Sequence, residues 1–276
     1  MERKTLGKTG ESVAAIGLGT WSMGGREFPD SRDDERCIAA IKLAVELGMN
    51  HIDTAEMYAA GHAEELVGQA VKSFSRDEVF IATKVWHTNL RYEDVLKSCR
   101  RSLERLQLKY VDLYMVHWPN PRIPVAETMR AMERLVKEGF VRYIGVSNFD
   151  VDLLTEAMES LKSEEVVSNQ VEYSLEARGV ERELIPFCER NGVTVVAYTP
   201  LGKGRILSEA TARGRALKQL AEKYGKTPAQ IALNWVIWKP SVITIPKAVK
   251  QEHLRENAAA AGWRLAEEDY ELLSRT

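Results

Sequence analysis

The chain repeats one unit eight times: a short apolar segment rich in β-branched residues, a polar loop and an amphipathic helical segment. Parallel strands that are covered on both faces appear in a sequence as short, continuous apolar runs. We therefore predict eight strands, at residues 15–18, 49–53, 79–84, 111–117, 141–147, 166–171, 193–198 and 242–245.

Helical patterns separate these predicted strands. They cover residues 33–47, 62–74, 91–106, 125–138, 150–161 and 180–190, followed by a paired stretch at 211–238. Three glycines, Gly48, Gly139 and Gly192, each follow a helical pattern and precede a strand. A glycine at this point closes the last helical turn in a left-handed conformation, which supports regular alternation of helix and strand.

Eight alternations indicate an α/β fold, a closed (β/α)8 TIM barrel, with its active site at the carboxyl ends of the strands. The chain has 276 residues, 45% of them hydrophobic, so we expect one domain over 1–276. The first fourteen residues read as a short β-hairpin before the barrel. An open, doubly wound sheet is the competing architecture, but GLGTWS at 17–22 lacks the third glycine of a dinucleotide-binding loop.

Charge and composition favour chemistry on small molecules. Lys and Arg number 38 against 40 Asp and Glu, and neither sign forms a long block, so we expect no nucleic-acid or membrane partner. No signal-peptide core or membrane-spanning run is present, which predicts a cytoplasmic protein, and we expect a monomer. Cys37, Cys99 and Cys188 show no disulfide or zinc spacing, so we assign them no function and expect no metal.

Four polar residues lie near the ends of three consecutive predicted strands: Asp53, Tyr58, Lys84 and His117. A tyrosine hydroxyl titrates near pH 10 in water, so as an acid or base at neutral pH it needs a cation beside it, held by a carboxylate. Tyr58, Lys84 and Asp53 have the side chains for these three roles, and His117 adds an imidazole that can orient a carbonyl. The four together predict a site that holds a carbonyl oxygen and protonates it.

Each of these residues also has a simpler interpretation. Asp53 and Lys84 can form a purely structural ion pair, His117 can be a hydrogen-bonded core histidine, and Tyr58 can pack in a loop. An aldolase that uses Lys84 for a Schiff base is a further alternative. The joint occurrence of the four residues at adjacent strand ends favours a shared catalytic site.

Six short stretches lie in order along residues 17–257: GLGTW at 17–21, HIDTAEMY at 51–58, GVSNF at 145–149, NQVEY at 169–173, YTPLG at 198–202 and IPK at 245–247. Together they resemble the aldo-keto reductase family. The resemblance implies a barrel that binds a nicotinamide cofactor without a Rossmann fold, with Asp53, Tyr58, Lys84 and His117 as its catalytic residues. It also implies NADPH-dependent reduction of aldehydes and some ketones by direct hydride transfer, with Tyr58 as the general acid or base.

The resemblance also implies which residues contact the cofactor. Ser147, Asn148 and Gln170 match residues that bind the nicotinamide carboxamide, and Tyr198 matches the aromatic ring stacked under the nicotinamide. Residues Thr199, Leu201, Gly202 and Lys203 match the loop along the pyrophosphate. The other matching positions are Gly19, Thr20, Trp21, Asp53, Pro246, Lys247, Ala248, His253, Glu256 and Asn257.

Within this set, Lys247 matches the residue that pairs with the 2′-phosphate of NADPH, at a loop entering a helix, where anions bind well. Well-known NADPH-specific members have Ser and Arg where this chain has Ala248 and His253. A neutral histidine does not replace the planar charged fork of arginine. We therefore expect NADPH to be preferred, but less strongly than usual, with some use of NADH.

For the substrate, the resemblance places Trp21 and Trp86 at the mouth above the nicotinamide and Trp118 beside His117. Tyr58 and His117 are also expected to contact the substrate. The loop at 118–124 is short, and the chain ends soon after a helical pattern at 266–273. We therefore expect an open site that accepts several aldehydes. The alternative function is a regulatory NADPH-binding protein like the channel-associated β-subunits that share this barrel.

Overall fold

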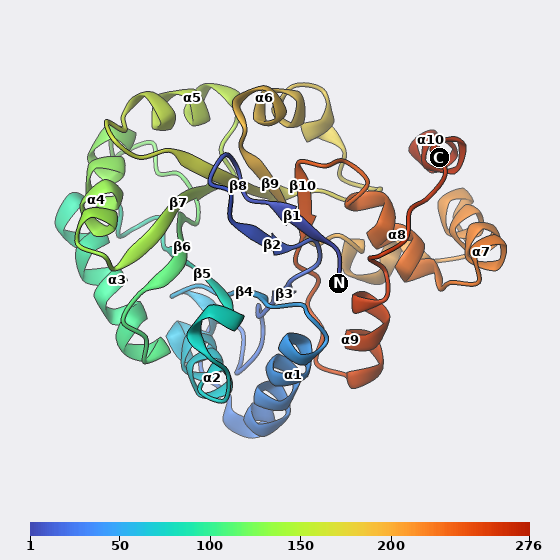
Figure 1. The fold of residues 1–276 in the computed structure, drawn as a ribbon, viewed down its shortest axis with the longest axis horizontal. Coiled ribbons are helices and arrows are strands. Elements are labelled where there is room, and N and C mark those ends of the chain that lie inside the picture. Colours follow the sequence, from blue (N-terminus) through green and yellow to red (C-terminus); the bar gives the residue numbers. More distant parts are fainter.

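The computed structural model describes residues 1–276, and its main feature is a sheet of eight parallel strands in which each strand pairs with the next one along the chain (Figure 1). The strands are β3 (Leu18–Gly19), β4 (His51–Asp53), β5 (Phe80–Val85), β6 (Val111–Val116), β7 (Val141–Ser147), β8 (Val166–Glu172), β9 (Thr194–Tyr198) and β10 (Val242–Thr244). Sequential parallel pairing of this kind is typical of a (β/α)8 barrel.

The sheet closes on itself where the segment before β3 meets β10. Ile16 forms an isolated parallel bridge with Thr244. The N–H of Gly17 donates to the carbonyl of Thr244 at 2.8 Å, and the N–H of Thr244 donates to the carbonyl of Ala15 at 2.9 Å. The predicted barrel is thus confirmed. The first strand lies later than the predicted 15–18, because most of that segment forms the closing seam instead of pairing with β4.

Ten α-helices accompany the sheet, and most of them surround it (Figure 1). They are α1 (Asp34–Glu46), α2 (His62–Val71), α3 (Tyr92–Leu106), α4 (Val125–Lys137), α5 (Val151–Glu159), α6 (Leu184–Asn191), α7 (Ala212–Tyr224), α8 (Pro228–Val236), α9 (Gln251–Ala258) and α10 (Glu267–Ser274). The predicted helix at 180–190 is divided into a short 3-10 turn (Gly179–Glu181) and α6. Pro186 explains the late start of α6, because proline is tolerated only in the first turn of a helix.

An antiparallel hairpin of β1 (Arg3–Thr5) and β2 (Ser12–Ala14) lies across one end of the barrel, as predicted (Figure 1). The side chains of Leu6 and Val13 join the apolar cluster inside the barrel. Lys4 donates to the carbonyls of Lys239 at 2.7 Å and Val242 at 2.8 Å, where β10 begins. The hairpin therefore covers the end at which the strands start and leaves the opposite end, where they finish, for a site.

Helix-ending turns follow the predicted pattern. Gly48, Gly139 and Gly192 have φ values of 83°, 77° and 67°, in the left-handed region that an L side chain rarely adopts. Each turn returns the chain directly from a helix to the next strand.

No helix in the structure combines the length and the apolar character needed to cross a membrane.

Candidate active site

The structure brings the four predicted residues together at the carboxyl end of the strands. Asp53 is the last residue of β4, Lys84 lies near the end of β5, and His117 directly follows β6. Tyr58 begins the short 3-10 turn Tyr58–Gly61 after β4. Lys84 is fully buried, Asp53 is 1% exposed, and Tyr58 and His117 are each 7% exposed, so all four side chains are largely shielded from solvent.

Lys84 is the centre of this group. Its ammonium donates to the Asp53 carboxylate (Oδ1) at 2.6 Å, to the carbonyl of Thr54 at 2.8 Å and to the Tyr58 hydroxyl at 3.3 Å. An ammonium has three donors, and here all three are used. The second Asp53 oxygen accepts from the Gln170 amide at 2.8 Å. The carboxylate is thus held from two sides, and the ammonium is fixed beside the phenol.

The protonation states follow from burial and charge. Burial raises the pKa of Tyr58 and outweighs the opposing effect of the Lys84 charge, so the phenol carries its proton at neutral pH. Burial alone would lower the pKa of Lys84, but Asp53 and Tyr58 outweigh it and raise that pKa. Burial, together with the Lys84 charge, lowers the pKa of His117 to about 2. The group therefore combines a neutral phenol, an ammonium and a neutral imidazole.

The turn that carries Tyr58 is held in an unusual conformation. Ala59 and Ala60 have φ values of 49° and 52°, which cost free energy for any residue with a side chain. The N–H of Ala59 donates to the carbonyl of Arg26 at 2.8 Å, which ties the turn to the loop at 22–30. Residues in such conformations cluster at functional sites, where the surrounding structure maintains them. The arrangement fixes the Tyr58 ring against its neighbours.

Aromatic contacts set the position of His117. The Tyr58 and His117 rings meet edge to face, with centroids 5.5 Å apart, and the Trp86 ring contacts His117 in the same way at 5.1 Å. Glu56 holds the Trp86 segment, because its carboxylate accepts from the Trp86 N–H at 2.7 Å and from Asn89 at 3.0 Å. Trp86 thus packs beside the imidazole.

Opposite these residues, the ends of β7, β8 and β9 present polar side chains. The Ser147 hydroxyl donates to the carbonyl of Gln170 at 2.8 Å. The Asn148 amide donates to the Ser147 hydroxyl at 3.0 Å and to the carbonyl of His117 at 3.1 Å, and its oxygen accepts from the Tyr198 hydroxyl at 3.0 Å. Burial raises the pKa of Tyr198 to about 12, so this hydroxyl is a donor. The network links the predicted carboxamide contacts to Asp53, through Gln170, and to His117, through Asn148.

These groups open into a cavity of about 600 Å³ at the mouth of the barrel. It is lined by Gly19, Trp21, Ser22, Asp53, Met57, Tyr58, His117, Trp118, Ser147, Asn148, Gln170, Tyr198, Thr199, Pro200, Leu201, Lys203, Gly204, Ile245, Pro246 and Lys247. Trp21 and Trp118 are 44% and 43% exposed and form its outer rim. Trp86 does not line this cavity; it packs against His117, which does.

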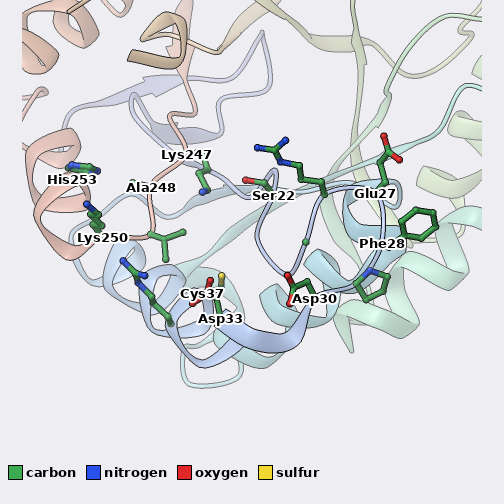
Figure 2. Close-up of a pocket in the computed structure, with 16 residues that line it drawn as sticks. Ser22, Glu27, Phe28, Asp30, Asp33, Cys37, Lys247, Ala248, Lys250 and His253 are labelled. Atoms are coloured by element: carbon green, nitrogen blue, oxygen red, sulfur yellow. The ribbon is translucent and has the colours of Figure 1, made fainter. Parts of the chain in front are cut away.

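A second cavity, of about 990 Å³, adjoins the first and shares Ser22 and Lys247 with it. Ala248 and His253 lie here (Figure 2). Of the other residues expected to contact cofactor, Gly202 is buried against Glu176, and Thr20 is buried with its hydroxyl donating to the carbonyl of Asp53 at 3.0 Å. Neither residue lines the first cavity, but the residues on both sides of each in the sequence do.

Two further predicted contacts, Glu256 and Asn257, lie on α9 outside both cavities. The Glu256 carboxylate accepts from the Thr227 hydroxyl at 2.5 Å, and Asn257 is buried at 3% exposure. Apart from Thr20, Gly202, Glu256 and Asn257, every residue predicted to contact the cofactor lines one of the two adjoining cavities.

Several residues of the site were not predicted from the sequence. Ser22, Met57 and Ile245 line the first cavity, and the carbonyl of Thr54 holds Lys84. Thr54, Met57 and Ile245 stand inside or beside the motifs, so their positions gave a usable signal. Ser22 has a φ of 67°, which no sequence pattern indicated.

Comparison with known proteins gives the same assignment as the geometry. The model of the Aldo/keto reductase family matches residues 15–275. Methylglyoxal reductase YeaE of Escherichia coli (strain K12) is 36% identical over 276 residues, covering 100% of this chain and 95% of that protein.

Two solved structures are similar over the whole of this chain. A thermostable aldo-keto reductase in complex with the inhibitor epalrestat has 50% identity and a TM-score of 0.95, with 99% of that chain covered. An aldo/keto reductase from Klebsiella pneumoniae in complex with NADP and acetate has 38% identity and a TM-score of 0.91, with 95% of that chain covered. The family match covers nearly all of the sequence, and the resemblance seen in the motifs is confirmed. This chain belongs to the aldo/keto reductase family.

Proposed function

We propose that this protein is an NADPH-dependent reductase of aldehydes, in which Tyr58 protonates the carbonyl oxygen. One observation carries the proposal. Tyr58 lines a cavity of about 600 Å³, and its hydroxyl accepts from the buried Lys84 ammonium at 3.3 Å, while Asp53 holds that ammonium at 2.6 Å. A neutral phenol beside a fixed cation is suited to giving up a proton, because the cation stabilises the phenolate that remains.

The two adjoining cavities fit an elongated dinucleotide. The first presents neutral donors and acceptors from Ser147, Asn148 and Gln170, which suit a carboxamide. The second contains lysine and arginine side chains, which suit phosphate. Lys247 lines both, so one ligand can extend from Tyr58 into the cationic region. When bound, the reduced nicotinamide supplies the hydride for the carbonyl carbon.

The side chains of this chain then supply the proton and the orientation. The Tyr58 phenol transfers its proton to the carbonyl oxygen as negative charge develops there, and the Lys84 ammonium stabilises the phenolate until solvent restores the proton. Asp53 keeps Lys84 in place. His117, whose pKa of about 2 keeps it neutral, offers an N–H donor that can orient the carbonyl.

For the substrate we propose small aldehydes and 1,2-dicarbonyl compounds, with aryl aldehydes also accepted. The E. coli relative is named a methylglyoxal reductase, which supports the small dicarbonyl class. The half-exposed Trp21 and Trp118 leave the mouth open, so little substrate surface is removed from water. Such a site is expected to turn over several aldehydes and to bind none tightly. We propose that a monomer suffices, because one chain contributes every group in the site.

The test is NADPH oxidation, followed by absorbance, with methylglyoxal, glyceraldehyde, an aryl aldehyde and a ketosteroid, and with NADH in parallel. We expect turnover of the first three compounds, slow turnover of the ketosteroid, and a higher kcat/KM with NADPH than with NADH. Binding of NADPH without turnover of any carbonyl compound would contradict the reductase and favour the regulatory alternative. Borohydride trapping of a substrate on Lys84 would instead indicate aldolase chemistry.

A further inference from the structure

The second cavity carries cationic side chains from parts of the chain that are far apart in sequence. Arg36 comes from α1, whereas Lys247 and Lys250 come from the segment before α9. Figure 2 shows Lys250 and His253 on one side of this cavity and Glu27 and Phe28 on the opposite side. The charges are therefore unevenly distributed around the cavity.

Arg36 has no carboxylate partner. The nearby acids Asp30 and Asp34 pair with Arg32 and His62, at 2.5 Å and 2.9 Å. Glu27, Asp30 and Asp33 also line this cavity, but none of them forms an ion pair with Arg36. An arginine without a partner at the edge of a cavity is available to an anionic ligand.

Arg36 also lies next to the start of α9. A third cavity, of about 570 Å³, is lined by Arg36 together with Val249, Lys250, Gln251 and Glu252. Lys250 is the N-cap residue of α9, and no side chain caps the free N–H groups of its first turn. These N–H groups and the helix dipole add to the attraction for an anion at this point. Arg36 and the α9 N-terminus therefore border the same space.

We propose that Arg36, with Lys250, binds the phosphate that distinguishes NADPH from NADH, and so sets the cofactor preference of this chain. The inference rests on the proposed function and assigns a specificity role to a residue of α1. Ala248 and His253 provide no permanent positive charge, and Arg36 supplies a planar guanidinium from α1, beside the start of α9. The ligand group is a phosphate monoester carried near an adenosine. Discrimination against NADH is therefore stronger than Ala248 and His253 alone suggest.

The test measures binding and needs no turnover. Dissociation constants for NADP⁺ and NAD⁺ are determined by titration calorimetry for the native chain, Arg36→Ala, Arg36→Lys and Arg101→Ala. Arg101 is a matched control, because it is an exposed arginine within α3 and lines none of these cavities. Thermal unfolding of each variant checks that the fold is kept, which is expected because alanine favours helix at an exposed position.

The expected result is a rise of roughly fivefold to tenfold in the NADP⁺ dissociation constant for Arg36→Ala, with the NAD⁺ constant changed less than twofold. Arg36→Lys should lie between Arg36→Ala and the native chain, and Arg101→Ala should match the native chain. An NADP⁺ to NAD⁺ ratio unchanged by Arg36→Ala, or an equal loss for both nucleotides, would overturn the inference. Failure of the native chain to bind either nucleotide would overturn the proposed function itself, before any variant is compared.

Discussion

Replacing Asp53 by asparagine keeps the shape of the side chain and removes its charge. In the native protein the fully buried Lys84 ammonium has this carboxylate at 2.6 Å as its only anionic partner. Removing one member of a buried ion pair costs about 3–5 kcal/mol, because the other charge is left in a medium that solvates it poorly. For a chain of this size, about 1 kcal/mol changes the unfolding midpoint by roughly 2–4 °C. Asp53→Asn should therefore lower the midpoint by about 10 °C.

The loss of stability in Asp53→Asn should decrease as pH rises. In the native protein the pKa of Lys84 is raised, so the stabilisation from this pair is present at neutral pH and is lost only as pH rises through that pKa. In Asp53→Asn, the carboxylate no longer offsets the effect of burial on Lys84, so the pKa of Lys84 falls below its value in the unfolded chain. The deficit relative to the native protein should then shrink as pH rises, because a neutral amine needs no counter-charge.

Scanning calorimetry of both proteins from pH 6 to pH 10 measures this difference. Asp152→Asn serves as a control, because Asp152 is exposed in the first turn of α5 and forms no ion pair. That substitution should change the midpoint by no more than roughly 2 °C. A midpoint for Asp53→Asn within 2 °C of native, or a deficit that does not change with pH, would refute the electrostatic account of the site.

Three further predictions concern pH, substrate and loop contacts. Burial lowers the pKa of His51 to about 4 and that of His117 to about 2, so below about pH 6.5 the unfolded chain binds protons at these residues that the folded chain does not bind, and stability should fall. Unfolding midpoints that stay constant from pH 7 to pH 4 would contradict this. In steady-state assays, Trp21→Ala should raise KM roughly tenfold for aryl aldehydes and less than twofold for methylglyoxal, because the 44% exposed ring offers apolar contact only to larger substrates. An equal rise for both substrates would contradict the placement of Trp21 at the rim of an open site. Arg205→Ala should speed NADP⁺ release about twofold to fivefold in stopped-flow measurements, since the ion pair of Arg205 with Glu176 at 3.0 Å ties the loop at 199–207 to the segment after β8. An unchanged rate would show that other contacts hold this loop.

The barrel and the meeting of the candidate catalytic residues at one end of it could be predicted, because both depend on local patterns. Apolar runs and helix-ending glycines define the alternation, and alternation determines which ends of the strands share one mouth. Asp53, Lys84 and His117 therefore meet wherever their strands are parallel neighbours. The first strand was misplaced because the closing seam at Ile16 depends on β10, which lies more than 200 residues away.

Contacts between segments that are distant in the sequence could not be predicted from it. The hydrogen bond from Gln170 to Asp53 joins residues 117 positions apart, and nothing in either motif indicates it. The left-handed Ala59 and Ala60 were also unexpected, because alanine normally avoids that region and tertiary contacts maintain it here. Arg36 stands in no motif, and only the packing of α1 near α9 brings it into the cationic cavity.

The proton on Tyr58 is the central claim, and Tyr58→Phe tests it most directly. This substitution removes only the hydroxyl and keeps the ring that contacts His117. The measurement pairs kcat for methylglyoxal reduction with the dissociation constant for NADPH. The account predicts a fall in kcat of at least about 100-fold, with NADPH binding changed less than about twofold. A variant that keeps most of its turnover would contradict Tyr58 as the proton donor.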